Sequence, residues 1–325
     1  MLQIRQVKHL AGQLKTSTAR LHDVAESVSS YCEELTLLDP AKPDRPRDVL
    51  NVTGALRTLQ TQLLRRVLLP KLTPSEFSHG GIRGRHIKSN IQPHIESVFV
   101  FTTDISNFYP TVSRNRVYDL FATKLGCSPD VARICTRICT YRHHLALGLV
   151  TSPILADQVL GDVDLRIAGV CQQANAVYSR FVDDITISSS FDLERSGLPN
   201  LVESILGDHG FSVNPLKNRF GRISDGVTIT KIRINNGHPD VRREYLVELE
   251  RQLDDVASLA AGNEFTGPYY TKSQIGGRVQ FVCWINPNRR RRLLRWHRSI
   301  PWEQVEQEAR HRLLIANKKV LTKRT

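Results

Sequence analysis

The sequence lacks a long hydrophobic run, and its few cysteines are not arranged as metal ligands. No stretch of 18 or more apolar residues occurs in the 325 residues, which excludes an ordinary transmembrane helix. The N-terminal residues contain no apolar secretion signal, so we expect a cytoplasmic protein without a membrane partner. The six cysteines form no CxxC pair, and we expect Cys135 and Cys139 to share a buried helix face. Repeats and low-complexity segments are also absent from the sequence.

Acidic residues are fewer than basic residues. The chain has 45 Lys and Arg against 32 Asp and Glu, a formal net charge of +13. The excess gathers in residues 289–325, which hold twelve Lys or Arg and three Glu. Arginine forks match phosphate groups, and an indole such as that of Trp296 stacks on exposed bases. The segment is therefore predicted to bind a nucleic-acid backbone, with a solvated basic helix and an anionic membrane surface as weaker alternatives.

The hydrophobic pattern predicts a mixed α/β core between helical ends. Residues 1–38 have the spacing of one or two amphipathic helices, and residues 39–48 form a Pro-rich, charged linker. The strands are predicted at 97–103, 177–181, 185–188 and 227–235, the middle two as a hairpin. The helices of the core are predicted at 55–69, 114–125, 130–142, 154–168 and 198–209, and the chain beyond 236 is almost wholly helical.

Three aspartates stand at the tips of predicted strands. Asp104 ends an apolar β-type run, and Asp183 and Asp184 separate the two strands of the predicted hairpin. A carboxylate in such a place is costly unless a cation or a donor meets it. If the three converge, they form a site for hard divalent cations, and two Mg²⁺ ions are the usual clamp for phosphoryl displacement.

Four motifs of the sequence resemble those of reverse transcriptases. Residues 104–110 (DISNFYP) are similar to the family's first palm motif, and residues 181–184 (FVDD) to its YxDD motif. Residues 145–157 (LALGLVTSPILAD) resemble LPQGxxTSPxLxN, and residues 210–219 (GFSVNPLKNR) resemble GFxxNxxKT. Their order and spacing agree with the family across roughly residues 42–302. The resemblance implies an RNA-directed DNA polymerase.

Within that family the sequence is most similar to bacterial retron-type and phage-defence enzymes. Residues 79–87 (HGGIRGRHI) match HGFxxGRSI, and residues 90–94 (NIQPH) resemble the retron NAxxH signature. Leu147 replaces a usual Gln, Phe181 a usual Tyr, and Lys231 the Gly of a VTG signature. Two alternatives stay open: a protein-primed or template-independent DNA polymerase of abortive-infection type, and a non-catalytic RNA-binding defence scaffold.

The resemblance implies an α+β right-hand polymerase fold, with fingers, a palm whose antiparallel sheet carries the FVDD hairpin, and a helical thumb. We assign residues 1–38 to an N-terminal helical segment, 39–103 to the fingers, 104–236 to the palm with finger insertions, and 237–325 to a basic helical thumb and C-terminal region. The implied partners are an RNA template, expected to be a cognate non-coding RNA, a DNA product and deoxynucleotides. An effector protein or a second copy of the chain is a further candidate partner.

The resemblance also assigns roles to single residues. Two Mg²⁺ ions would be held by Asp104, Ile105, Asp183 and Asp184, and Lys217 would protonate the leaving pyrophosphate. Tyr109 would exclude a ribose 2′-hydroxyl, while His94 is expected to be structural. The nucleotide would be bound by Arg45, Arg47, Tyr109, Gly148 and Ser152. The nucleic acid would be bound by Arg83, Arg85, Arg289, Arg290, Arg291, Arg292 and Trp296.

Overall fold

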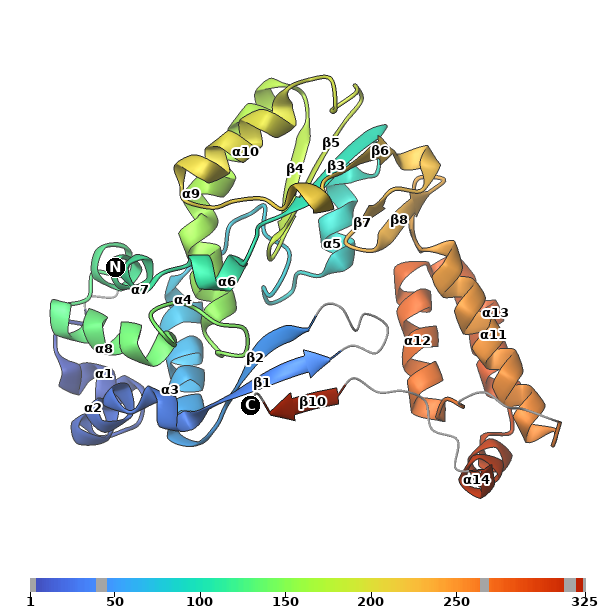
Figure 1. Cartoon of the computed structure of the whole chain (residues 1–325), viewed down its shortest axis with the longest axis horizontal. Coiled ribbons are helices and arrows are strands. Elements are labelled where there is room, and N and C mark those ends of the chain that lie inside the picture. The colour runs from blue at the N-terminus through green and yellow to red at the C-terminus, as the bar shows by residue number, and fades with distance from the viewer. Residues whose placement is uncertain (1–3, 39–45, 264–268, 313–319, 324–325) are drawn as a thin grey trace.

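The computed structural model describes residues 4–38, 46–263, 269–312 and 320–323. Its centre is a four-stranded antiparallel sheet in the order β4-β5-β3-β6 (Figure 1). The strands are β3 Phe99–Asp104, β4 Val177–Phe181, β5 Asp184–Ser189 and β6 Arg219–Arg222. Val182 and Asp183 form the two-residue turn between β4 and β5. The predicted antiparallel sheet with an FVDD hairpin is therefore confirmed.

Helices pack beside this sheet close to the predicted positions. The long helix α9 (Ser152–Gln173) runs along β4, α10 (Leu198–Asp208) packs on α9, and the short α5 (Ile87–Ile91) also contacts β4. Apolar side chains of α9 such as Leu155 and Leu160 are fully buried in the main core. The core therefore fixes α9 against the strand that leads into the FVDD turn.

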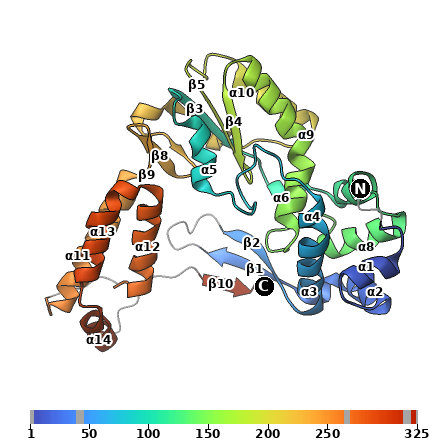
Figure 2. The same cartoon turned by 180° about the vertical axis from the view of Figure 1, so that it is seen from behind.

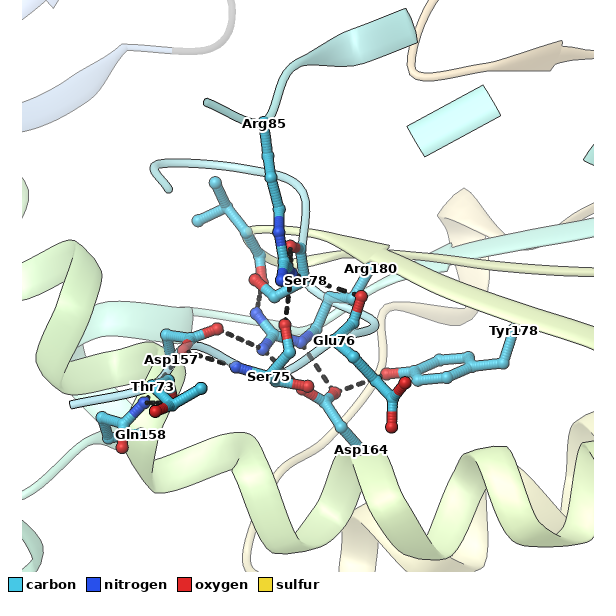
Figure 3. A network of polar contacts seen from close by, with 11 residues as sticks. Thr73, Ser75, Glu76, Ser78, Arg85, Asp157, Gln158, Asp164, Tyr178 and Arg180 are labelled. Carbon is cyan, nitrogen blue, oxygen red and sulfur yellow. Dashed lines mark hydrogen bonds and ion pairs between the residues drawn. The ribbon is translucent and has the colours of Figure 1, made fainter. Parts of the chain in front are cut away.

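A buried ion pair fastens α9 to β4 (Figure 3). Arg180 of β4 is 1% exposed, and its Nε and Nη2 donate to the two carboxylate oxygens of Asp164 at 2.8 and 2.7 Å. Nη2 also donates to Asp157 at 3.1 Å, and the hydroxyl of Tyr178 donates to Asp164 at 2.7 Å. Since Asp157 and Asp164 are seven residues apart, they lie on one face of α9.

The N-terminal helices α1 (Val7–Gln13) and α2 (Thr18–Glu26) confirm the expected amphipathic pattern. The prediction of helix throughout residues 1–38 was wrong for its end, because β1 (Cys32–Leu38) is a strand. It pairs with β2 (Arg47–Val52) and with β10 (Val320–Lys323) in a second antiparallel sheet (Figure 1). The predicted linker 39–48 thus ends in a strand at Arg47, and a strand follows the C-terminal helices.

A separate helical body follows the sheets, on the opposite side of the molecule from α1, α2 and α8 in both views (Figures 1 and 2). It consists of α11 Arg243–Ala260, α12 Lys272–Ile285, α13 Arg290–Ser299 and α14 Trp302–Arg312. Its core is distinct from the main core and buries Leu253, Val279 and Leu293. The small sheet of β7 Thr228–Ile229, β8 Ile232–Asn235 and β9 His238–Val241 precedes it.

The other described elements are short. The helices are α3 Gly54–Leu63, α4 Leu69–Lys71, α6 Phe108–Thr111, α7 Arg114–Asp119 and α8 Pro129–Cys139. Single 3₁₀ or π turns lie at Val28–Tyr31, Leu64–Leu68, Gln92–His94, Leu120–Lys124, Pro215–Lys217, Ile223–Asp225 and Pro287–Arg289. Cys135 and Cys139 are both buried on α8. No helix in the described part of the chain is long and apolar enough to span a membrane.

Candidate active site

The fold brings the three aspartates of the strand tips together. Asp104, the last residue of β3, is the direct partner of Asp184, the first residue of β5. Directly paired residues of antiparallel strands place their side chains on the same face of the sheet. The Ile105 amide donates to the Asp183 carbonyl at 3.0 Å, which ties the turn to the end of β3. The predicted convergence of the carboxylates therefore follows from strand register.

The turn that carries Asp183 is unusual in its backbone. Val182 has a φ of 62°, in the left-handed region that β-branched residues avoid. Of the two central residues of the turn, Val182 has a positive φ and Asp183 does not. This is the pattern of a type II′ turn, in which the first central position favours glycine. Such a conformation costs about 1 to 3 kcal/mol and persists only where surrounding contacts impose it.

The electrostatic field at this turn disfavours ionised acids. Burial raises the pKa of Asp183, and the neighbouring carboxylate of Asp104 raises it further. Although part of Asp184 is exposed, desolvation and then the charges of Asp183 and Asp104 raise its pKa to about 6. Three carboxylates at one place repel one another, and a nearby positive charge relieves that repulsion.

The carboxylate of Asp104 has one oxygen that is available to a cation. Its Oδ2 accepts a hydrogen bond from the Lys217 ammonium, whereas its buried Oδ1 has no hydrogen-bond partner among the described residues. No three His, Cys, Asp or Glu side chains form a ready metal cage in those parts of the chain. The acids thus have oxygen ligands to offer a hard divalent cation, and Lys217 neutralises Asp104 in this structure.

Two of the residues predicted to bind the nucleotide lie near these carboxylates. Tyr109, on α6, has its pKa raised to about 12 by burial and then by the charge of Asp183. Arg47, exposed at the start of β2, lies close enough to lower the pKa of Asp183. The Gly148 loop packs on β2, where the Leu50 amide donates to the Leu147 carbonyl at 2.8 Å. The structure thus brings Tyr109 and Arg47 within electrostatic reach of Asp183.

Gly148 has a structural reason to be glycine. Its φ is 107°, and an added Cβ would overlap the carbonyl of Leu50. The glycine therefore permits a close approach to the chain's own strand β2. Ser152 is buried in the first turn of α9, and its hydroxyl donates to the Ala146 carbonyl at 2.8 Å. Arg45 lies outside the described residues.

Residues 79–85 (HGGIRGR) form a glycine-rich loop, and one of its two arginines is available to a ligand. Arg83 is exposed and lines a mostly apolar hollow of about 590 Å³ beside Pro153. Arg85 instead donates to the carbonyls of Ser75, Glu76 and Ser78, so it holds the loop together (Figure 3). Arg85, predicted to bind nucleic acid, thus has its Nη1 engaged within the protein.

The basic helix α13 presents some of its predicted arginines and uses others internally. A hollow of about 660 Å³ is lined by Pro287, Arg290, Arg291, Leu294, Arg295 and Arg298. Arg289 instead donates to both carboxylate oxygens of the fully buried Asp240, at 2.9 and 2.6 Å. Arg289, predicted to bind nucleic acid, is thus engaged within the protein and joins the start of α13 to β9.

Two further predicted contacts of α13 have partners within the protein. The guanidinium of Arg292 pairs with Glu250 and lies 5.9 Å from the centre of the Trp296 ring. Trp296 is half-buried and packs against the second core, so its ring is not a free stacking platform. The sequence-based set omits Arg295 and Arg298, although their spacing of three places them on one face with Arg291.

The signature-like residues 90–94 lock α5 to the sheet. The buried His94 ring hydrogen-bonds to Ser188 and Ser179, both at 2.7 Å, and burial lowers its pKa to about 3. Asn90 donates to Thr230 at 2.9 Å in the β7–β8 turn. Lys231, the residue at the Gly position of the signature, has a φ of 67° there. His94 is thus structural, as expected.

The sequence-based set of residues omits Arg180, Asp157 and Asp164. The signal is present in the sequence: a charged residue interrupts the apolar strand before FVDD, and two aspartates seven residues apart share the buried face of α9. A buried charge requires a partner, so these residues could have been matched before the structure was known.

The raised pKa of Asp184 predicts a pH-dependent stability. In the metal-free protein, Asp184→Asn removes a carboxylate that is ionised at pH 7.5 at a cost to the folded state. We expect a gain of about 1 kcal/mol, after allowance for solvent screening, and a rise of about 2 °C in Tm. Because the pKa of Asp184 is raised in the folded state, the parental protein loses stability as pH rises and this carboxyl ionises. The stability gain of Asp184→Asn is therefore full above pH 6 and disappears as the pH falls from 6 to 4.

Thermal unfolding in EDTA across this pH range measures the effect. Asp162→Asn, an exposed position on α9, is the control and should leave Tm unchanged at every pH. A pH-independent gain for Asp184→Asn would contradict the electrostatic description of the turn.

Comparison with known proteins agrees with the geometry. A family model described as reverse transcriptase (RNA-dependent DNA polymerase) matches residues 42–246. The retron Ec86 reverse transcriptase of Escherichia coli is 25% identical over 288 residues, which cover 84% of this chain and 87% of that protein. The retron Se72 reverse transcriptase of Salmonella heidelberg (strain 579083-10) is 25% identical over 241 residues, covering 72% and 63%.

The retron Mx65 reverse transcriptase of Myxococcus xanthus is 26% identical over 298 residues, which cover 85% of this chain and 66% of that protein. These matches confirm the resemblance first carried by the four sequence motifs. The family model spans well over half of the chain and includes every aspartate of the site. The chain therefore belongs to the reverse transcriptase family of RNA-directed DNA polymerases, and within it is similar to the retron enzymes.

Proposed function

We propose that the chain copies a cognate non-coding RNA into DNA by two-Mg²⁺ nucleotidyl transfer at Asp104, Asp183 and Asp184. The observation that carries the proposal is the buried Oδ1 of Asp104, which has no hydrogen-bond partner among the described residues. The carboxylates of Asp183 and Asp184 lie beside it and raise the local negative charge. Carboxylate oxygens are preferred ligands of hard divalent cations, and a bound cation would relieve the repulsion between the three carboxylates. Membership in a polymerase family favours catalysis over a non-catalytic RNA-binding scaffold.

The residues divide the work of phosphoryl transfer. Two Mg²⁺ ions supply charge neutralisation for the attacking and leaving oxygens. Asp104 and Asp183 would hold them with Asp184 in support, and the Ile105 amide holds the Asp183 carbonyl of the turn. Lys217 pairs with Asp104 in this structure, and with a cation in its place at that carboxylate it would be available to protonate the departing pyrophosphate.

Nucleotide selection is proposed for the residues on the fingers side of the carboxylates. Arg47 binds the triphosphate from the start of β2, and the Gly148 loop supports that strand through the Leu147–Leu50 hydrogen bond. The ring of Tyr109, close to Asp183, blocks a ribose 2′-hydroxyl. The roles of Arg47 and Tyr109 are those that the resemblance to reverse transcriptases implies for these residues.

The exposed face of α13 is proposed to bind the phosphate backbone of the RNA or of the RNA–DNA duplex. Arg290, Arg291, Arg295 and Arg298 line one hollow, and a basic helical face suits duplex RNA, which is recognised mainly by shape and phosphate. Arg83 would add a contact near the glycine-rich loop. The similarity to retron reverse transcriptases supports a retron-type template.

The proposed site predicts a clean loss of synthesis. Asp183→Asn and Asp104→Asn should each lower deoxynucleotide incorporation at least a thousandfold, because the ions they hold stabilise charge in the transition state. RNA binding and Tm should change little, since the carboxylates make few structural contacts. Primer extension with Mg²⁺, with RNA affinity measured in parallel, checks this. Near-normal incorporation by either variant would remove the assignment.

A second prediction concerns sugar discrimination. Tyr109→Ala should raise the kcat/KM of ribonucleotides relative to deoxynucleotides at least tenfold, because only the bulk of the ring opposes the 2′-hydroxyl. Competition between the two nucleotide types during extension measures the ratio. Tyr118→Ala, a half-buried tyrosine on α7, is the matched control and should leave the ratio unchanged. Unchanged discrimination in Tyr109→Ala would show that its ring is only part of the core.

A third prediction separates the arginines of the α13 region. Replacing Arg290, Arg291, Arg295 and Arg298 by Gln should weaken RNA binding and flatten its salt dependence by about one slope unit per lost phosphate contact. Arg289→Gln should lower Tm with little change of slope, since Arg289 pairs with Asp240. Filter binding of RNA at several salt concentrations measures both. A slope unchanged by the fourfold replacement would show that this face serves another partner.

A further inference from the structure

The turn that carries the catalytic Asp183 is held at both of its carbonyls. On one side the Ile105 amide donates to the Asp183 carbonyl at 3.0 Å. On the other side Nη1 of Arg180 donates to the Val182 carbonyl at 2.7 Å. The two peptides on either side of Asp183 are thus both fixed, one by a side-chain donor from β4 and the other by the main-chain donor that directly follows β3.

Every nitrogen of the Arg180 guanidinium donates at least one hydrogen bond. Nε and Nη2 form a fork on Asp164, Nη2 also reaches Asp157, and Nη1 is left for the turn (Figure 3). The planar geometry of the group therefore sets the direction of Nη1 once the two aspartates of α9 are engaged. A lysine in its place has a single ammonium, which cannot repeat this arrangement.

The glycine-rich loop presses on the same turn from another side. The His79 amide donates to the Arg180 carbonyl at 2.7 Å, and the Arg180 amide donates to the Phe77 carbonyl at 2.8 Å. Gly80 then approaches the turn so closely that an added Cβ would lie 2.6 Å from the Val182 nitrogen. The left-handed Val182 is therefore enclosed by Gly80 and the Arg180 guanidinium.

We propose that Arg180 is a positioning residue for the reverse transcriptase reaction: its guanidinium, oriented by Asp164 and Asp157, holds the Val182 carbonyl and so keeps Val182 left-handed and Asp183 aimed at the metal ions. The inference rests on the proposed two-metal site. Arg180, which lies outside the FVDD motif, thereby contributes to the metal affinity and to the turnover rate. Substrate contacts are not involved, because Arg180 is buried beneath the turn.

The test compares Arg180→Lys with variants that separate the turn from the buried network. Val182→Gly accepts the left-handed conformation without strain, so it should compensate for a missing donor to the turn. Tyr178→Phe removes a hydrogen bond to Asp164 and disturbs the network without touching the turn. Gly80→Ala displaces the turn without touching the network, and Gly161→Ala, which meets open space on α9, is its control.

Three quantities are measured for each full-length variant: Tm, Mn²⁺ affinity by electron paramagnetic resonance, and dTTP incorporation on poly(rA)–oligo(dT). Arg180→Lys should weaken Mn²⁺ binding and lower kcat about tenfold each, with less than a threefold change in the KM for dTTP. Adding Val182→Gly should restore both at least threefold. Gly80→Ala should resemble Arg180→Lys, whereas Tyr178→Phe should lower Tm and leave Mn²⁺ affinity and kcat near parental values.

The inference is overturned if folded Arg180→Lys binds Mn²⁺ and turns over like the parental protein. It is also overturned if Arg180→Lys and Tyr178→Phe lose activity in proportion to their Tm and Val182→Gly restores nothing, because that pattern marks a purely structural residue. If Arg180→Lys does not fold, parental behaviour of Gly80→Ala overturns it. A parental protein that neither binds Mn²⁺ nor incorporates dTTP would overturn the proposed two-metal site itself, and this inference with it.

Discussion

A guanidinium buried between two carboxylates joins the parts of this molecule that must stay in register. Arg180 ties β4 to Asp157 and Asp164 of α9, and its main chain ties β4 to the glycine-rich loop. Removing one partner of such a buried pair typically costs about 3 to 5 kcal/mol, because a charge is left uncompensated. The sheet, the long helix and the loop are therefore joined at one residue, and the FVDD turn lies where they meet.

The same turn carries a second constraint, which is charge. Burial and mutual repulsion raise the pKa values of Asp183 and Asp184, while Lys217, Arg47 and Lys231 act in the opposite direction. These three cations come from separate parts of the chain, and the fold gathers them around one pair of strand ends. A site that repels its own carboxylates and keeps positive side chains near them is prepared for exchange of one cation for another.

Much of this arrangement could be predicted from the sequence, and the parts that could not have physical reasons. The strand ends at Asp104 and Phe181 follow from apolar runs broken by acids, and register then brings the carboxylates together. The pairing of Arg289 with Asp240 joins residues 49 positions apart, so no local pattern reveals it, and Arg289 looks like its exposed neighbours. The strand β1 likewise depends on partners at Arg47–Val52 and Val320–Lys323, and its own sequence reads as an extension of the helices before it.

If Asp104, Asp183 and Asp184 bind two metal ions, Asp104 must exchange the Lys217 ammonium for a metal ion when substrate binds. The most direct measurement is a crystal structure of the protein with a primed RNA template, a deoxynucleoside triphosphate and Ca²⁺, which binds without supporting turnover. We predict two cations bridging Asp104 and Asp183 to the triphosphate, with Oδ1 of Asp104 as a ligand and the Lys217 ammonium turned toward the phosphates. A triphosphate bound without cations at Asp104, or Lys217 still paired with that carboxylate, would show that Asp104 does not exchange its ammonium partner for a metal ion.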